Sequence, residues 1–187
     1  MSYEKDVTEL GCAGRRRFLR ASVAGAVLAA APLSSRVWAA SERSLTLLNL
    51  HTGERVSQPY WMQGKYLPDS LAEINSVLRD HRSGEIYPID PTLLDLLSGL
   101  QQRVGSHAGY EVISGYRSPA TNAQLRNQSS GVAKRSLHMQ GKAIDIRLPG
   151  TQLAQLHRAA KSMQVGGVGL YTRSNFIHVD TGRVRYW

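Results

Sequence analysis

Cysteine and acidic residues are scarce in this sequence of 187 residues. The only cysteine is Cys12, which lies in a segment that we expect to be removed from the mature protein. A chain that begins at Ala40 has no disulfide and no thiolate, so cysteine-based catalysis and thiolate metal sites are excluded. The apolar stretch Ala21–Leu33 is too short to be a good transmembrane span. No internal repeat or low-complexity tract is present.

The N-terminal segment resembles an export signal. Gly14–Arg20 reads as a twin-arginine motif, Ala21–Leu33 is uncharged and rich in alanine, and Val37–Ala39 has the small or modest side chains that a signal peptidase accepts. We therefore predict a twin-arginine signal peptide over residues 1–39, cleavage after Ala39 and a periplasmic location. The competing interpretation is an uncleaved amphipathic tail or a membrane anchor. With cleavage, we expect no stable membrane insertion.

The shortage of acidic residues leaves the chain basic. Lys and Arg outnumber Asp and Glu by 23 to 14, which gives a formal net charge of +9. Removal of residues 1–39 leaves 17 basic and 11 acidic residues, a net charge of +6. A basic surface suits nucleic acid or an anionic polymer. No run of Lys and Arg interleaved with aromatic residues supports nucleic acid, and export favours an acidic polymer outside the cytoplasm.

Residues 40–187 are enough for one domain with its own core and too few for two. Periodicity predicts an N-terminal hairpin over 45–57 and helices over 69–82, from 90 to 105, over 119–128 and over 151–163. In the first helix, the segment Asp69–Glu73 resembles a capping box. The three glycines within 166–169 are not followed by Lys and a helix, so they indicate close strand packing rather than a phosphate loop.

The richest chemical pattern is Ser136–Asp145, followed later in the chain by Phe176–Asp180. His138 and Asp145 are seven residues apart, and one straight strand would separate them by about 23 Å. Gly141 supplies the turn that brings them together. Imidazole and carboxylate are ligands that zinc accepts in hydrolytic centres, which suggests a zinc site in a hydrolase.

Strand periodicity predicts how these residues meet. In residues 143–147, alternation places Asp145 on one face of a strand and its isoleucine neighbours on the other. In residues 176–180, the same period places Phe176, His178 and Asp180 on one face. We expect the two strands to be neighbours, so that Asp145 and His178 lie side by side and His138 arrives from the preceding loop.

This pattern resembles the M15 zinc peptidases, the D-alanyl-D-alanine carboxypeptidase group, which share a Ser-x-His-(x)6-Asp segment and a later His. Further segments resemble the MepK subgroup of murein endopeptidases, and together they cover essentially the whole chain after residue 44. These segments are 48–54, 113–118, 131–134, 166–169 and 174–182.

The resemblance implies an α+β fold in which helices flank a small antiparallel sheet that carries the metal, as in hedgehog and D-alanyl-D-alanine peptidases. It also implies one zinc ion held by His138, Asp145 and His178, and peptidoglycan as the partner. Ser136 occupies a position that contacts substrate in that family, although it could be an ordinary loop hydroxyl.

Arg117 follows the strand expected over 110–114, after a Gly-containing turn. Its planar guanidinium suits a substrate rich in carboxylates and a developing oxyanion, so we predict substrate-binding and catalytic roles. The alternative is a salt-bridged surface arginine. The remaining histidines are expected to be ordinary surface or core residues: His51, His81, His107 and His157.

The general base is the weakest part of the pattern. Positions that carry a Glu or a His in many M15 peptidases are Asn175 and Phe176 here, and neither can act as a base. Asp180 is the nearest carboxylate, and we predict that it accepts a proton from water; its other possible role is to orient a ligand imidazole. His51 and Glu54 are two less favoured candidates for the general base.

The sequence therefore predicts a monomeric zinc peptidase that cleaves peptide cross-links of peptidoglycan. The resemblance suggests bonds between two meso-diaminopimelate residues, which is an L,D-endopeptidase activity. One alternative is a D,D-carboxypeptidase or D,D-endopeptidase that acts on D-alanyl bonds. Another is a non-catalytic zinc-containing module that binds peptidoglycan.

Overall fold

The computed structural model describes residues 42–129 and 131–187, so the signal peptide predicted over 1–39 lies outside the described residues. The strands are β1 (Arg43–Asn49), β2 (Arg55–Met62), β3 (Lys65–Tyr66), β4 (Tyr110–Ser114), β5 (Ala143–Arg147), β6 (Gly167–Tyr171), β7 (Phe176–Asp180) and β8 (Arg185–Tyr186). The helices are α1 (Pro68–Val77), α2 (Pro91–Arg103), α3 (Pro119–Gln128), α4 (Leu153–Met163) and the 3-10 helix η1 (Leu137–Gln140). None of the described helices has the length and apolar character needed to cross a membrane.

All eight strands belong to one sheet, in the order β3-β2-β1-β4-β5-β7-β6-β8. Neighbouring strands are antiparallel except at two places, where β1 pairs with β4 and β6 pairs with β8 in parallel. The hairpin expected over 45–57 is formed by β1 and β2. The fold is therefore α+β with a mainly antiparallel sheet, as predicted.

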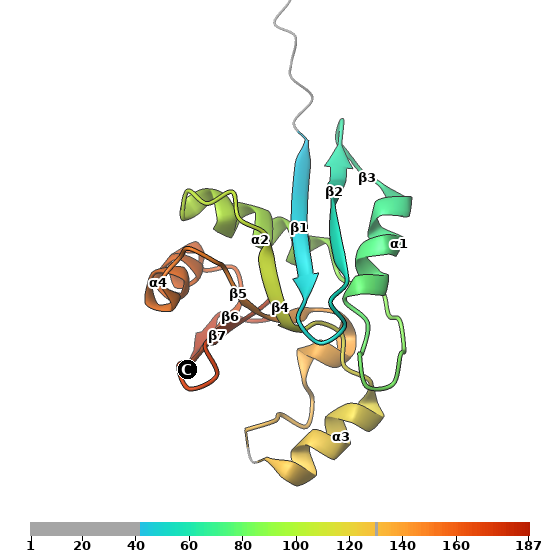
Figure 1. Cartoon of the computed structure of the whole chain (residues 1–187). Coiled ribbons are helices and arrows are strands. Elements are labelled where there is room, and N and C mark those ends of the chain that lie inside the picture. The colour runs from blue at the N-terminus through green and yellow to red at the C-terminus, as the bar shows by residue number, and fades with distance from the viewer. Residues whose placement is uncertain (1–41, 130) are drawn as a thin grey trace, which may run out of the picture. The chain divides into compact units, whose positions relative to one another are not determined.

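A single hydrophobic core lies between the sheet and three of its helices. Helix α1 packs against β1 and β2, α2 against β1 and α4, and α4 against β6 and β7 (Figure 1). The adjacent strands β5 and β7 contribute Ile144 and Ile177, both fully buried, to this core. Because side chains alternate along a strand, Asp145 and His178 project from the opposite face of the sheet.

Helices α2, α3 and α4 begin and end close to their predicted positions. The Asp90 side chain caps α2 by accepting a hydrogen bond from the Thr92 amide at 3.0 Å. Gly105, the predicted stop signal, follows the end of α2 with a φ of +64°. The glycines of residues 166–169 lie at and within strand β6, which confirms the prediction of strand packing over a phosphate loop.

The prediction for α1 was right within one residue at the start but wrong about the N-terminal cap and the C-terminal end. The helix begins at Pro68, its N-cap is Leu67 without a side-chain hydrogen bond, and the expected capping box at Asp69 is not formed. Proline fixes φ at the first helical position and has no amide hydrogen of its own, so this start leaves one amide fewer to be capped. The helix ends at Val77 rather than near residue 82, because the carbonyl of Leu78 accepts the amide of Tyr116 at 2.8 Å.

Asp80 fixes the chain after this early end. Its buried carboxylate accepts hydrogen bonds from the amide of Ser118 at 2.9 Å and the amide of Arg82 at 3.0 Å. Burial opposes ionisation of this carboxyl, but the hydrogen bonds outweigh it and hold the pKa of Asp80 well below its ordinary value. Asp80 thus ties the segment after α1 to the segment that carries Arg117.

We expect Asp80→Ala to lower the free energy of unfolding by about 2 kcal/mol at pH 7, because the buried amide of Ser118 and the partly buried amide of Arg82 lose their acceptor. Since the pKa is depressed in the folded state, this stabilisation is present at neutral pH and is lost as the pH falls below about 4. Urea unfolding at pH 7 and pH 3 measures both effects. Asp80→Asn keeps one acceptor oxygen and should cost less. A difference between Asp80→Ala and wild type that did not change with pH would contradict the assignment.

Candidate metal centre

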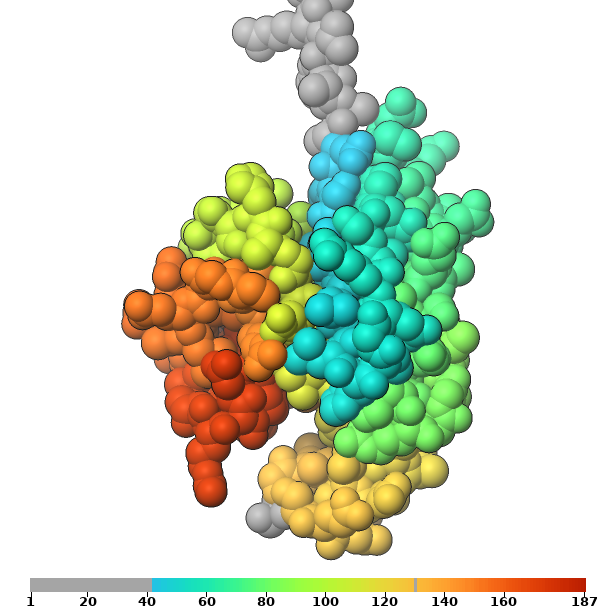
Figure 2. Space-filling model, in the orientation of Figure 1, coloured from blue at the N-terminus to red at the C-terminus, as the bar shows by residue number. Residues whose placement is uncertain are grey.

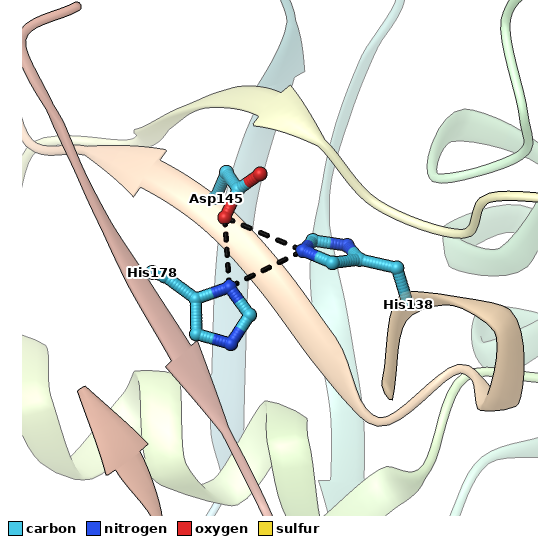
Figure 3. Close-up of side chains that lie close together, drawn as sticks. All are labelled: His138, Asp145 and His178. Atoms are coloured by element: carbon cyan, nitrogen blue, oxygen red, sulfur yellow. Dashed lines mark hydrogen bonds and ion pairs between the residues drawn. The ribbon is translucent and has the colours of Figure 1, made fainter. Parts of the chain in front are cut away.

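Three side chains from separate elements meet on the face of the sheet opposite the core. His138 comes from η1, Asp145 from β5 and His178 from β7, and all three are buried (Figure 3). The His138 Nε2 atom lies 3.2 Å from His178 Nδ1 and 3.3 Å from Asp145 Oδ1, and His178 Nδ1 lies 2.9 Å from Asp145 Oδ1. One potential ligand atom from each residue therefore points into the same small volume.

The register of β5 and β7 places two of these side chains side by side. Asp145 is directly paired with His178 in the antiparallel ladder, as the strand periodicity predicted. His138 is delivered by the turn at Gly141, whose φ is +65°. The amide of Arg117 donates to the carbonyl of His138 at 3.2 Å, which ties η1 to the segment after β4. The position of the His138 side chain therefore depends on a tight turn and on a hydrogen bond between residues distant in sequence.

Gly141→Ala should damage both the fold and the site. A Cβ atom there would lie 2.1 Å from the carbonyl oxygen of Pro88, and the positive φ is also unfavourable for alanine. We expect a loss of about 2–4 kcal/mol in unfolding free energy, measured in urea, together with weaker zinc binding in a titration. Gly150→Ala is the matched control, because its φ is +77° but nothing lies within 4 Å of the added Cβ. Equal losses in the two variants would show that the contact with Pro88 has no role.

Hydrogen bonds at the far side of each imidazole select its tautomer. The Nδ1 atom of His138 lies 2.7 Å from the carbonyl oxygen of Gly115, so it carries the proton and leaves the Nε2 lone pair facing Asp145. The Nε2 atom of His178 lies 2.9 Å from Asp180 Oδ2, so the free lone pair of His178 is on Nδ1. Two imidazole lone pairs and a carboxylate oxygen thus converge, which is a donor set that suits zinc.

Charged and hydrogen-bonding neighbours shift the pKa values of Asp145 and His178 in opposite directions. Burial opposes the ionisation of Asp145, but His138 and His178 outweigh it and hold the pKa of Asp145 well below its ordinary value. Burial lowers the pKa of His178, but hydrogen bonds to Asp145 and Asp180 outweigh it and raise this pKa. Asp145 is consequently a carboxylate at neutral pH, which is the form that binds a cation.

Asp180 is completely buried and fully engaged by donors. Besides its hydrogen bond with His178, Asp180 accepts hydrogen bonds from Arg185 Nη2 at 2.7 Å and from Arg185 Nη1 at 3.1 Å. The amides of Gly167 and Gly182 donate to its Oδ1 atom at 3.0 and 2.9 Å. Burial opposes ionisation of Asp180, but these donors hold its pKa well below its ordinary value. The carboxylate faces the far side of the His178 ring, away from the converging ligand atoms.

Arg117 and Ser136, the other predicted site residues, both lie beside the three potential ligands. The Nη2 atom of Arg117 is 3.6 Å from Asp145 Oδ2 and donates to the Ser114 hydroxyl at 3.2 Å. Burial lowers the pKa of this guanidinium. Its buried Nε atom has no hydrogen-bond partner within the part of the chain that the structure describes. Ser136 is buried, and its Oγ atom accepts the amide of His138 at 3.4 Å.

A cleft of about 430 Å³ opens onto these residues. One wall comes from the segment that follows α3 and from η1, and the other comes from β6, β7 and the segment around β8. Figure 2 shows the hollow between the yellow segment that contains α3 and the red C-terminal segment. Arg117, Ser136 and the three potential ligands all line this cleft, whereas Asp180 does not.

The two less favoured candidates for the general base, His51 and Glu54, lie outside the cleft. Glu54 is paired with Arg79, and the ring of His51 stacks on His81 at 3.8 Å between centroids. Neither His51 nor Glu54 lines the cleft. Phe176 lines the second wall beside His178, as strand periodicity predicted, but the sequence interpretation missed the other residues of that wall, namely Tyr171, Arg185 and Trp187. The glycines of β6 were the available signal, because bare backbone leaves room for large side chains from another strand.

Comparisons with known proteins identify the family of this chain. The family model of peptidoglycan L,D-endopeptidase MepK matches residues 37–187. Peptidoglycan L,D-endopeptidase MepK of Escherichia coli K12 is 44% identical over 179 residues, which cover 94% of this chain and 97% of the relative. Probable peptidoglycan L,D-endopeptidase MepK of Haemophilus influenzae is 45% identical over 146 residues, 78% of each chain. No solved structure matches the chain significantly. This chain belongs to the MepK family of M15-type peptidases.

Proposed function

We propose that this chain is a zinc-dependent peptidoglycan L,D-endopeptidase that hydrolyses cross-links between two meso-diaminopimelate residues. The observation that carries the proposal is the convergence of His138, Asp145 and His178 on one point in an open cleft. The relatives that match nearly the whole chain bear the name of this activity. One zinc ion bound by the three side chains would supply a Lewis acid that activates water and polarises the scissile carbonyl.

Arg117 is placed to serve the same reaction. Its side chain is mostly buried, lines the cleft and has an unpartnered Nε atom among the described residues. A buried donor of this kind gains a partner when a carboxylate or a developing oxyanion enters the cleft. We assign Arg117 to stabilisation of the tetrahedral oxyanion and Ser136 to substrate binding.

We assign Asp180 a positioning role. Its hydrogen bond holds the proton of His178 on Nε2, so that the Nδ1 lone pair points toward Asp145. Arg185 and two backbone amides occupy the rest of the carboxylate. These contacts support the second of the two roles predicted for Asp180, orientation of an imidazole, over acceptance of a proton from water.

We further propose that the enzyme acts in the periplasm as a monomer, after export by the twin-arginine pathway. The supporting feature is the order of the charged, apolar and cleavage segments within residues 1–39. Replacing both Arg15 and Arg16 by Lys should stop export, which fractionation of cells followed by immunoblotting would detect. Light scattering of the exported protein would measure its oligomeric state.

The activity test uses exported protein purified from the periplasm, with and without a chelator. Defined muropeptide dimers are offered, cross-linked either between two diaminopimelate residues or through D-alanine, and the products are followed by mass spectrometry. We expect chelator-sensitive conversion of the first dimer to monomers. Cleavage of the D-alanine cross-link instead would indicate a D,D-endopeptidase, and binding of zinc and sacculi without any turnover would indicate a non-catalytic module.

A further inference from the structure

Trp187 is a large aromatic residue held in one position while it remains half exposed. Its exposed fraction is 49%, yet its indole Nε1 donates a hydrogen bond to the Tyr171 hydroxyl at 2.9 Å. Its backbone is paired with β6 through Val168 and Leu170. The Arg185 guanidinium lies 5.0 Å from the indole centroid. An exposed tryptophan with this many fixed contacts presents a preformed apolar surface to the cleft.

Strand β6 makes room for this indole. A Cβ atom at Gly169 would lie 2.5–2.7 Å from atoms of the Trp187 ring, so the ring sits directly on bare backbone. Gly169 is paired with His178 across β6 and β7, on the face of the sheet that carries the metal ligands. The Trp187 ring centroid is accordingly 5.2 Å from that of His178. The indole therefore forms the wall of the cleft immediately beside the metal centre.

The position of the indole restricts what can pack on it. A group that touches Trp187 lies next to His178, so it belongs to a residue that flanks the scissile bond rather than to the glycan strand. In the substrate proposed above, both flanking residues are diaminopimelates, whose carboxylates and amines are joined by a chain of methylene groups. Methylene groups gain free energy when they leave water for an aromatic surface, at about 25 cal/mol per Å².

Resting on the proposed function, we infer that Trp187 is a substrate-positioning residue whose indole packs against the methylene chain of a diaminopimelate beside the scissile bond. Tyr171 and Gly169 set the orientation of the ring. The contact holds the peptide next to the metal centre, so it acts mainly on substrate binding. Its loss should raise KM by about tenfold and change kcat less than threefold, in line with loss of an apolar contact of this size.

The test compares Trp187→Ala, Trp187→Phe and a matched control, Tyr186→Ala, in exported protein. Tyr186 is the neighbouring exposed aromatic residue, and it contacts Lys161 rather than the cleft. The substrate is the muropeptide dimer cross-linked between two diaminopimelates, and zinc content is measured for each variant. We expect the full KM increase for Trp187→Ala, a smaller one for Trp187→Phe and none for Tyr186→Ala.

Binding without turnover gives a second readout. In zinc-depleted protein carrying Trp61→Phe, Trp187 is the one remaining tryptophan of residues 40–187. We expect its fluorescence to change on addition of the same dimer. An unchanged KM in Trp187→Ala would overturn the inference, as would an unchanged fluorescence at saturating dimer. Zinc loss in Trp187→Ala combined with a wild-type KM in Trp187→Phe would assign the residue a structural role only. If wild-type protein neither bound nor cleaved the dimer, the proposed function would fall as well.

Discussion

Asp145→Asn should lose nearly all of its bound zinc and at least about 1,000-fold of its hydrolytic activity. The asparagine has nearly the same shape, so β5 and β7 can keep their register, but it has no negative charge to offer a cation. It also leaves the buried Arg117 guanidinium without the carboxylate that lies 3.6 Å away. The three-ligand site is thereby reduced to two imidazoles.

Zinc content by mass spectrometry and turnover of the diaminopimelate-linked dimer measure the two losses in Asp145→Asn. The control is Asp69→Asn, a matched change at an exposed carboxylate in the first turn of α1. The control should keep both zinc and activity. Retention of stoichiometric zinc and of wild-type turnover by Asp145→Asn would exclude Asp145 as a ligand.

Short-range pattern was enough to predict how the proposed ligands meet. The alternation of residues 143–147 and 176–180 puts Asp145 and His178 on the same face once the two strands are neighbours, and the observed register confirms this. Gly141 was identified as the turn that returns His138 to the strand, and its positive φ agrees. These features depend on residues close in sequence, on strand period and on glycine chemistry.

The contacts that surround the proposed ligands could not be predicted from such local patterns. Arg185 reaches Asp180 only because the two-residue strand β8 pairs in parallel with β6, and two residues carry no periodicity. The placement of Trp187 on Gly169 depends on the same pairing. The end of α1 was mispredicted for a related reason, since the contact of Leu78 with Tyr116 joins segments far apart in the chain. Long-range packing determines these positions.

The role of Asp180 can be decided by the zinc dependence of an Asp180→Asn variant. The amide would place a donor among groups that already donate: the Arg185 guanidinium, the amides of Gly167 and Gly182, and His178 Nε2. We expect zinc affinity to fall about 10–100-fold, because the imidazole loses the partner that fixes its tautomer. We also expect unfolding free energy to fall by about 3 kcal/mol, because a charged partner is left uncompensated.

Activity measured in excess zinc distinguishes the two roles considered for the Asp180 carboxylate. If Asp180 only orients His178, saturating zinc restores most of kcat in Asp180→Asn, and activity at limiting zinc follows occupancy. If Asp180 takes a proton from water, kcat stays low by a factor of about 100 or more even when every site is filled. Arg185→Met should show a weaker loss of zinc affinity in the same direction, since it removes two of the donors that hold Asp180. The exposed Arg183→Met is its control. Because the carboxylate is enclosed on the side of His178 remote from the cleft, we expect recovery with zinc.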